Sequence, residues 1–256
     1  MRRNTMKEKL QNGEVVSGVV LQDFSPFIVE IVALSGFDWL FIDCEHAPLT
    51  IENVNSLVVV SELRRIVPLV RTPANAPEVI SRYLDTGAMG IIIPGINSKE
   101  AAERAVKATK YPPLGDRGLA GVRAADYGIG TSLAEYVKAA NEETMVLGVL
   151  EDKQGVENVN SILDTPGFDG LIIGTNDLSR SFGFPGQTKH PKVLEVIDRV
   201  LEAGNKKKKP IGGAVRMDED PQEYVQKGFK MLQITASALL QKSSKDFLKN
   251  ARSTKA

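Results

Sequence analysis

The chain has 256 residues, 42% of them hydrophobic, a length that suits one α/β barrel or two small domains. Lysine plus arginine equal aspartate plus glutamate at 32 each, so no overall charge favours nucleic acid or an anionic membrane surface. The start has no apolar segment, no run of about 18 uncharged apolar residues follows, and the lone Cys44 cannot form an intramolecular disulfide, which together predict a cytoplasmic protein without a membrane span.

Short apolar runs rich in β-branched residues recur along the chain, and each is predicted to form a strand. They lie at about 15–22, 38–43, 67–71, 90–94, 145–150, 170–174, 210–214 and 231–235. Because most are apolar throughout, they indicate a parallel sheet covered by helices on both faces.

Segments with helical periodicity alternate with these runs. Their boundary signals are the candidate N-caps Thr50 and Ser98, the candidate stops Gly87 and Gly204, and the first-turn prolines Pro191 and Pro221. Eight strand and helix units, with no glycine-rich dinucleotide or Walker loop, favour a (β/α)8 TIM barrel over a doubly wound open sheet. We therefore predict a single domain over residues 1–256 that ends in a helix at about 236–249.

Two polar segments interrupt this alternation. Residues 110–128 form a long connection, and connections beyond about 12–15 residues are often functional. This one reaches the active face only if it folds back. The lysine run at 206–209 follows Gly204 and is predicted to be a solvated turn.

Charged residues follow several of the predicted strands at the point where each strand ends. They are Asp43, Glu45 and His46 after the second, Arg71 at the end of the third, Glu151 after the fifth and Asp177 after the sixth. The carboxyl ends of barrel strands open onto one face, where such folds keep their chemistry. These residues therefore predict the active site.

Glu151 and Asp177 are the candidate metal ligands. Two carboxylates with several waters suit Mg²⁺ or Mn²⁺, whereas the chain lacks the cysteine clusters and paired histidines of a zinc site. The alternative for Asp177 is an N-cap of the short helix that follows it.

Arg71 is expected to point into the mouth of the barrel, where its planar cation suits a 2-oxo acid carboxylate or a developing enolate oxygen. Asp85, at the end of the following helix, is a candidate partner for Arg71 and could instead form only a rim ion pair with it. Asp43 is expected to reach the imidazole of His46 and to make it a general base or acid.

Other polar residues carry weaker signals. Gly174 precedes Asn176 and Asp177, and small residues there would let backbone amides approach a substrate carboxylate. Cys44 is predicted to be a small packed side chain, and His190 is not expected to act in catalysis.

Five ordered segments carry a family resemblance. They are FDWLFIDCEHAPLTIENV, VPLVRTP, YLDTGAMGIIIPGI, KYPPLGDRG and FDGLIIGTNDLSRSFGFPG, and from about residue 10 to 240 the chain resembles the metal-dependent pyruvate aldolases of the 4-hydroxy-2-oxoheptanedioate and 2-dehydro-3-deoxyglucarate aldolase type. The D-x-E-H and G-x-x-D-L motifs together make the resemblance specific.

The resemblance implies a role for each matching residue. Glu151 and Asp177 would bind a divalent ion (Mg²⁺, Mn²⁺ or Co²⁺), Arg71 would stabilise the pyruvate enolate, and His46 with Asp43 would transfer the proton. Asp85 would orient Arg71, and backbone amides near Asn176 and Asp177 would hold the pyruvate carboxylate. The family's final helix is exchanged with a partner subunit, which implies a homo-oligomer, a hexamer or trimer.

The chain departs from the family pattern at two positions. Asp152 follows Glu151 where threonine is usual, and Thr175 replaces a proline near Asp177. Neither change removes a catalytic group, so both bear on the aldehyde half of the substrate.

The resulting hypothesis is retro-aldol cleavage of a 4-hydroxy-2-oxo acid to pyruvate and an aldehyde, without a Schiff-base lysine. The alternative within enzymes is a related lyase or synthase acting on oxaloacetate, citrate or an acyl-CoA thioester. A metabolite-binding barrel without catalysis would show a disrupted set of site residues, and this set is intact.

Overall fold

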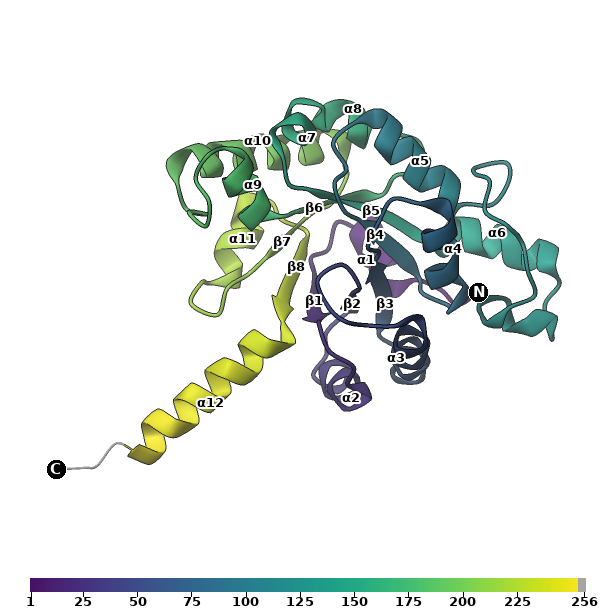
Figure 1. Cartoon of the computed structure of the whole chain (residues 1–256), viewed down its shortest axis with the longest axis horizontal. Helices are drawn as coiled ribbons and strands as arrows, with labels where there is room; N and C mark the ends of the chain where they lie inside the picture. The colour runs from purple at the N-terminus through teal and green to yellow at the C-terminus, as the bar shows by residue number, and fades with distance from the viewer. Residues whose placement is uncertain (253–256) are drawn as a thin grey trace.

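The computed structural model describes residues 1–252 and contains a closed barrel of parallel strands in the order β1 to β8 (Figure 1). The strands are β1 (Val16–Leu21), β2 (Trp39–Asp43), β3 (Val67–Arg71), β4 (Gly90–Ile93), β5 (Met145–Leu150), β6 (Gly170–Ile173), β7 (Ile211–Ala214) and β8 (Met231–Thr235). Each bound lies within one residue of its prediction. The expected TIM barrel is therefore confirmed.

Most helices lie around the barrel and alternate with the strands along the chain, while α1 precedes β1 (Figure 1). They are α1 (Thr5–Gln11), α2 (Pro26–Leu34), α3 (Ile51–Arg64), α4 (Pro77–Asp85), α5 (Lys99–Thr109), α6 (Leu133–Glu143), α7 (Lys153–Glu157), α8 (Val159–Leu163), α9 (Thr175–Ser181), α10 (Pro191–Lys207), α11 (Pro221–Lys227) and α12 (Ala236–Arg252), with a 3-10 segment η1 (Arg123–Gly128). Thr50 and Ser98 cap α3 and α5 as predicted, because their side chains accept hydrogen bonds from the exposed amides of the first turn.

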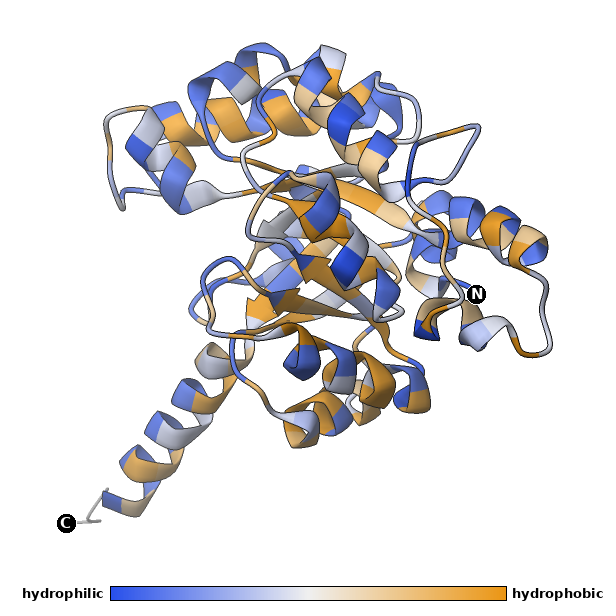
Figure 2. Cartoon of the chain, turned by 45° about the vertical axis from the view of Figure 1, so that its right-hand side comes forward, coloured by the Kyte–Doolittle hydropathy of each residue, from blue (hydrophilic) through white to orange (hydrophobic). Residues whose placement is uncertain are grey.

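Two apolar layers make the core. One fills the barrel and includes Trp39, Phe41, Leu69, Leu147 and Met231, and the other packs the outward faces of the strands against the helices. Figure 2 shows this pattern as strongly hydrophobic central strands with mixed helices around them. Strands buried on both faces must be apolar at nearly every position, which is why their bounds could be predicted.

The predicted helix stop at Gly204 is wrong. Helix α10 continues to Lys207 and ends at Lys208, which has a left-handed backbone conformation (φ 54°). A Cβ on Gly204 would lie 2.3 Å from Cγ1 of Ile211, so a larger residue there would collide with β7. The glycine therefore permits close packing of α10 against the barrel.

The long connection at 110–128 lies at the amino-terminal end of the barrel. Arg117 donates to Asp85 at the end of α4 (2.8 Å), and Arg123 donates to Glu62 near the end of α3 and to the carbonyl of Thr86 (2.7 Å). In a strand and helix repeat, each helix runs back, so its last residues lie at the end opposite to the active face. This connection therefore links the ends of α3 and α4 and does not reach the active face.

Helix α12 leaves the barrel and points away from it (Figure 1). None of its described residues is buried, and Leu240, Phe247 and Leu248 are exposed by 66%, 72% and 42%. Within residues 1–252, no helix is long and apolar enough to cross a membrane.

Candidate active site

The charged residues predicted at the strand ends gather at the carboxyl end of the barrel. Asp43 and Arg71 are the last residues of the paired strands β2 and β3, and they are register partners. Glu151 directly follows β5, and Asp177 lies in the first turn of α9 after β6. The charges of Glu45, Asp177 and Arg71 all act on the carboxyl of Glu151, as expected for neighbours in one mouth.

Arg71 is held on three sides. Its Nε and Nη2 atoms donate to the two carboxylate oxygens of Asp43 at 3.0 and 2.7 Å, and its Nη1 lies 3.1 Å from Oε2 of Glu45. The guanidinium carbon lies 5.3 Å from the centre of the Phe41 ring. A bidentate ion pair with an aromatic contact fixes both the position and the plane of the cation.

Asp43 holds this arrangement together. Its side chain is fully buried, and one oxygen accepts the backbone N–H groups of Glu45 (3.1 Å) and His46 (3.2 Å). Burial raises the pKa of this carboxyl. The hydrogen bonds and charge of Arg71 lower the pKa by more than burial raises it, so the net pKa lies below the usual value of 3.8. Asp43 therefore stays ionised at neutral pH.

The expected contact between Asp43 and the His46 imidazole is not formed. Asp43 binds the backbone of this turn, and the side chain of His46 is 60% exposed with its Nε2 atom 3.7 Å from Oε2 of Glu45. The reason is local, since Arg71 and the turn amides already occupy the carboxylate of Asp43. Glu45, which sequence reasoning placed at the strand end without a role, connects His46 to Arg71.

The predicted pairing of Asp85 with Arg71 is also wrong. Asp85 is the last residue of α4 and accepts from Arg117 at 2.8 Å, at the end of the barrel opposite to Arg71. Arg117 is almost fully buried and lies 4.8 Å from the ring centre of Tyr111. Within one subunit Asp85 cannot orient Arg71.

Glu151 has the environment of a candidate metal ligand. Its Oε1 accepts the backbone N–H of Gly95 at 2.8 Å, and a Cβ on Gly174 would lie 3.3 Å from its Oε2. Glycine at 174 therefore leaves space beside that oxygen. Burial raises the pKa of Glu151, and the nearby charges of Glu45 and Asp177 add to the effect. A bound cation would favour the ionised form of Glu151 and so offset both the burial and the repulsion from these charges.

Asp177 is more open than Glu151. Its side chain is 43% exposed and pairs with Arg180 one helical turn later at 3.1 Å. The alternative role as an N-cap is not realised, because Gly174 occupies that position and Asp177 lies inside the helix. No group of three or more histidine, cysteine, aspartate or glutamate residues forms a ready metal site within residues 1–252. Glu151 and Asp177 still fit a hard ion that takes its remaining ligands from water and substrate.

The departures from the family pattern have local explanations. Asp152 caps α7 by accepting from the N–H of Gly155 (2.7 Å) and also accepts from the side chain of Asn97 (3.2 Å), so it serves the fold. Thr175 is the first residue of α9. It lines a cavity of about 320 Å³ with Asn176, Ala214 and Arg216, among others.

Cys44 and His190, the two residues expected to have no catalytic role, both have structural contacts. Cys44 is buried as predicted, so it is a packed side chain, and burial raises the pKa of its thiol to about 12. His190 caps α10 by accepting from the N–H of Lys192 at 3.2 Å, and it stacks on Phe184.

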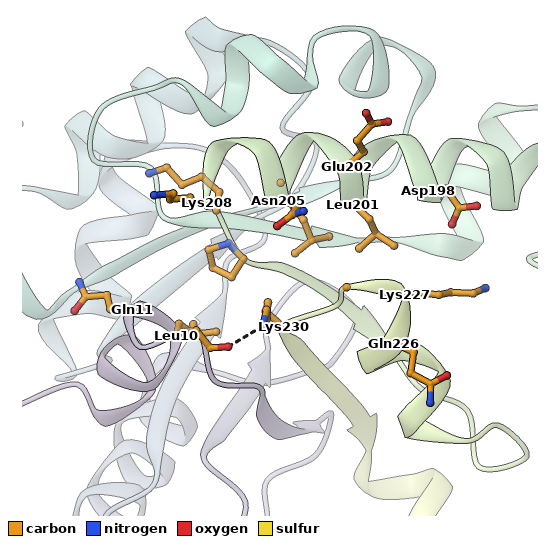
Figure 3. A pocket seen from close by; sticks show the side chains of 16 residues that line it. Leu10, Gln11, Asp198, Leu201, Glu202, Asn205, Lys208, Gln226, Lys227 and Lys230 are labelled. Carbon is orange, nitrogen blue, oxygen red and sulfur yellow. Dashed lines mark hydrogen bonds between the residues drawn. The ribbon is translucent and has the colours of Figure 1, made fainter.

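A large cavity of about 1000 Å³ opens at the other end of the barrel, between the ends of α1, α10 and α11 (Figure 3). Its lysines are partly used by the fold, since Lys230 donates to the carbonyl of Gly13 (2.7 Å) and Lys209 to that of Phe168. Asp198 and Glu202 offset the remaining positive charge. This cavity is separate from the strand-end residues and contains none of them.

Comparisons with known proteins identify a family and several relatives. Residues 17–241 match the family described as HpcH/HpaI aldolase/citrate lyase. The 5-keto-4-deoxy-D-glucarate aldolase of Escherichia coli O139:H28 is 35% identical over 225 residues, which cover 88% of this chain and 87% of that protein.

Solved structures of similar proteins share the fold over nearly the whole chain. An HpcH/HpaI aldolase/citrate lyase family protein from Burkholderia cenocepacia J2315 is 33% identical with a TM-score of 0.92, covering 98% of this chain and 100% of that one. The citrate synthase SbnG is 30% identical with a TM-score of 0.85, covering 96% of each chain.

Proposed function

The chain belongs to the HpcH/HpaI aldolase/citrate lyase family and is a carbon–carbon lyase, and from this premise we propose that it cleaves a 4-hydroxy-2-oxo acid to pyruvate and an aldehyde in a reaction that depends on a divalent metal ion. The observation that carries the proposal is the position of Arg71. Its guanidinium is fixed by Asp43 and Glu45 at the same barrel mouth as the carboxylates of Glu151 and Asp177.

Glu151 and Asp177 would hold the ion, which when bound supplies Lewis-acid polarisation of the 2-oxo group. Their oxygen donors suit Mg²⁺, Mn²⁺ or Co²⁺. The substrate carboxylate would lie against the amides at the start of α9, near Gly174, Asn176 and Asp177, where the positive end of the helix dipole favours an anion.

The side chains at the ends of β2 and β3 would transfer the proton and stabilise the developing negative charge. His46 is exposed to the mouth and would take the proton from the 4-hydroxyl, with Glu45 beside its imidazole. The bond between C3 and C4 then breaks, its electron pair passes to the pyruvate half, and the aldehyde leaves. Arg71 would share the negative charge that develops on the 2-oxo oxygen, and C3 finally accepts a proton.

The test is pyruvate release from a panel of 4-hydroxy-2-oxo acids, with rigorous chelation and add-back of each ion. We expect turnover to vanish after chelation and to return with Mg²⁺, Mn²⁺ or Co²⁺. Full activity of the stripped protein would reject the metal dependence, and absence of pyruvate from every substrate would reject the aldol cleavage.

A second candidate function is carbon–carbon synthesis or cleavage with oxaloacetate, citrate or an acyl-CoA thioester. It is favoured by the likeness to the citrate synthase SbnG. Calorimetric titration with coenzyme A separates the two functions. An aldolase of 2-oxo acids does not bind coenzyme A, so the titration should release no heat, whereas an enzyme that acts on an acyl-CoA thioester should release heat.

We also expect metal binding to depend on pH through Glu151. Protons and the metal compete for the same oxygens, and because the pKa of this carboxyl lies above its usual 4.5, the competition begins at a higher pH than for an ordinary glutamate. Affinity for Mn²⁺, measured by calorimetry, should fall as pH drops through the raised pKa. A flat profile down to pH 4.5 would contradict this.

We propose that α12 is exchanged with a second copy, which makes the chain one domain within a homo-oligomer, a hexamer or trimer. Leu240, Phe247 and Leu248 share one face of α12, and Phe27, Ile31 and Leu34 form an exposed apolar face on α2. Apolar faces of this kind are usually covered in a stable assembly.

Leu240→Lys with Phe247→Lys should therefore shift the mass measured by light scattering toward the monomer. Lys245→Gln, on the polar side of α12, should leave the mass unchanged. An oligomer that survives the paired change would argue against exchange.

The lone buried Cys44 suits a reducing compartment, and we place the protein in the cytoplasm on that ground.

A further inference from the structure

Gln233 is a polar residue inside the otherwise apolar barrel. It lies in β8, in register with Gly18 of β1 and Ala214 of β7. Met231, two residues earlier, belongs to the apolar cluster that fills the barrel. Since side chains alternate along a strand, Gln233 also points inward.

The side-chain oxygen of Gln233 has no partner in the fold. The residue is 5% exposed, and its Oε1 atom is buried without a hydrogen-bond partner among residues 1–252. Leaving a buried polar group unpaired is costly, so such a group in a native protein needs an explanation. Either end of the carboxamide can serve a ligand, because one end donates and the other accepts.

The position of Gln233 places it in a layer of side chains just below the strand ends that carry the candidate active site. It lies two residues before the end of β8, as Phe41 lies two residues before the end of β2. In such barrels, side chains from alternate strands share a layer, so Phe41 and Gln233 lie at the same level. The Arg71 guanidinium rests on the Phe41 ring, with 5.3 Å between its carbon and the ring centre. Gln233 therefore belongs to the layer that forms the floor under Arg71.

The register neighbours of Gln233 are small residues. Ala214 has a short side chain and is exposed at the mouth, and Gly18 has none. Trp39 covers Gly18, since a Cβ there would lie 2.5 Å from the indole Nε1. That Nε1 is also buried without a partner. The single tryptophan of the chain thus lies against Gly18, the register neighbour of Gln233, and its fluorescence can report on this part of the barrel.

We propose that Gln233 is a substrate-binding residue whose carboxamide, turned so that its Nε2–H faces the mouth, donates a hydrogen bond to an oxygen of the pyruvate half of the substrate. This inference rests on the proposed function, since it requires a 2-oxo acid at the barrel mouth. The competing explanation is a purely structural role, in which Gln233 only packs in the core and binds no substrate.

Gln233→Met separates the two roles, because methionine has a similar shape and no hydrogen-bonding amide. A substrate role predicts about fivefold to tenfold weaker binding of pyruvate, the loss of one neutral hydrogen bond, with a melting temperature that is unchanged or higher. A structural role predicts a lower melting temperature with unchanged pyruvate affinity.

The experiment titrates pyruvate into the full-length protein with Mn²⁺ and follows Trp39 fluorescence, with calorimetry as a second measurement. Met231→Leu, on the same strand and deeper in the barrel, is the matched control and should bind pyruvate like the wild type. Equal affinity of the wild type and Gln233→Met overturns this inference alone. Failure of the wild type to bind pyruvate overturns the proposed function and this inference with it.

Discussion

Replacing Glu151 with glutamine should reduce metal affinity by at least about a hundredfold and bring metal-dependent pyruvate release below detection. Glutamine keeps the shape of the side chain and its contact with the Gly95 amide but removes the charge that attracts the ion. Because burial already disfavours that charge, the metal-free protein should be as stable as the wild type or more so. Calorimetric titration with Mn²⁺ and thermal unfolding measure the two effects.

Asp152→Asn is the matched control for this change. Asp152 is the adjacent carboxylate, but it caps α7 through the N–H of Gly155. Its replacement should cost at most about 1 kcal/mol of stability and leave metal affinity within about twofold of the wild type. Equal loss of metal affinity in both variants would show that Glu151 has no special role.

Replacing Arg71 with lysine should slow proton exchange at C3 of pyruvate by about a hundredfold or more, with little change in metal affinity. A lysine ammonium cannot make the bidentate bond to Asp43 while also reaching Glu45, so the positive charge no longer has a fixed position. Loss of one preorganised donor to a developing oxyanion typically costs a factor of about 10² to 10³. Exchange is followed by NMR in deuterated water.

Arg64→Lys provides the comparison, because Arg64 forms an exposed ion pair with Glu30 far from the mouth. Exchange should be unchanged in that variant. If Arg71→Lys retained wild-type exchange, charge stabilisation at this position would have to come from another group.

The strands of this barrel were predictable because their burial on two faces is visible in the sequence. The runs that became β3, β5 and β8 were placed without error at either end. The ends of those strands were equally informative, since Arg71 and Glu151 are charges that interrupt apolar runs. Alternation of strands and helices then placed them on one face.

What could not be predicted depends on contacts between distant segments. Gly204 resembled a helix stop, but its lack of a side chain serves the packing of α10 on Ile211. Asp85 follows Arg71 closely in sequence, yet α4 carries it to the other end of the barrel, where Arg117 from the long connection binds it. Gln233 stood within an apolar run and gave no local signal that it lies in the same barrel layer as Phe41.

Asp43 and Glu151 take up their protons at different pH values, because their pKa values are shifted in opposite directions. The stability that Asp43 contributes is fully present above pH 3.8 and is lost only as the pH falls through its lower folded value. Glu151 takes up its proton earlier. Brief mild acidification should therefore strip the ion from a scaffold that remains intact, and neutralisation with fresh metal should restore the enzyme without refolding.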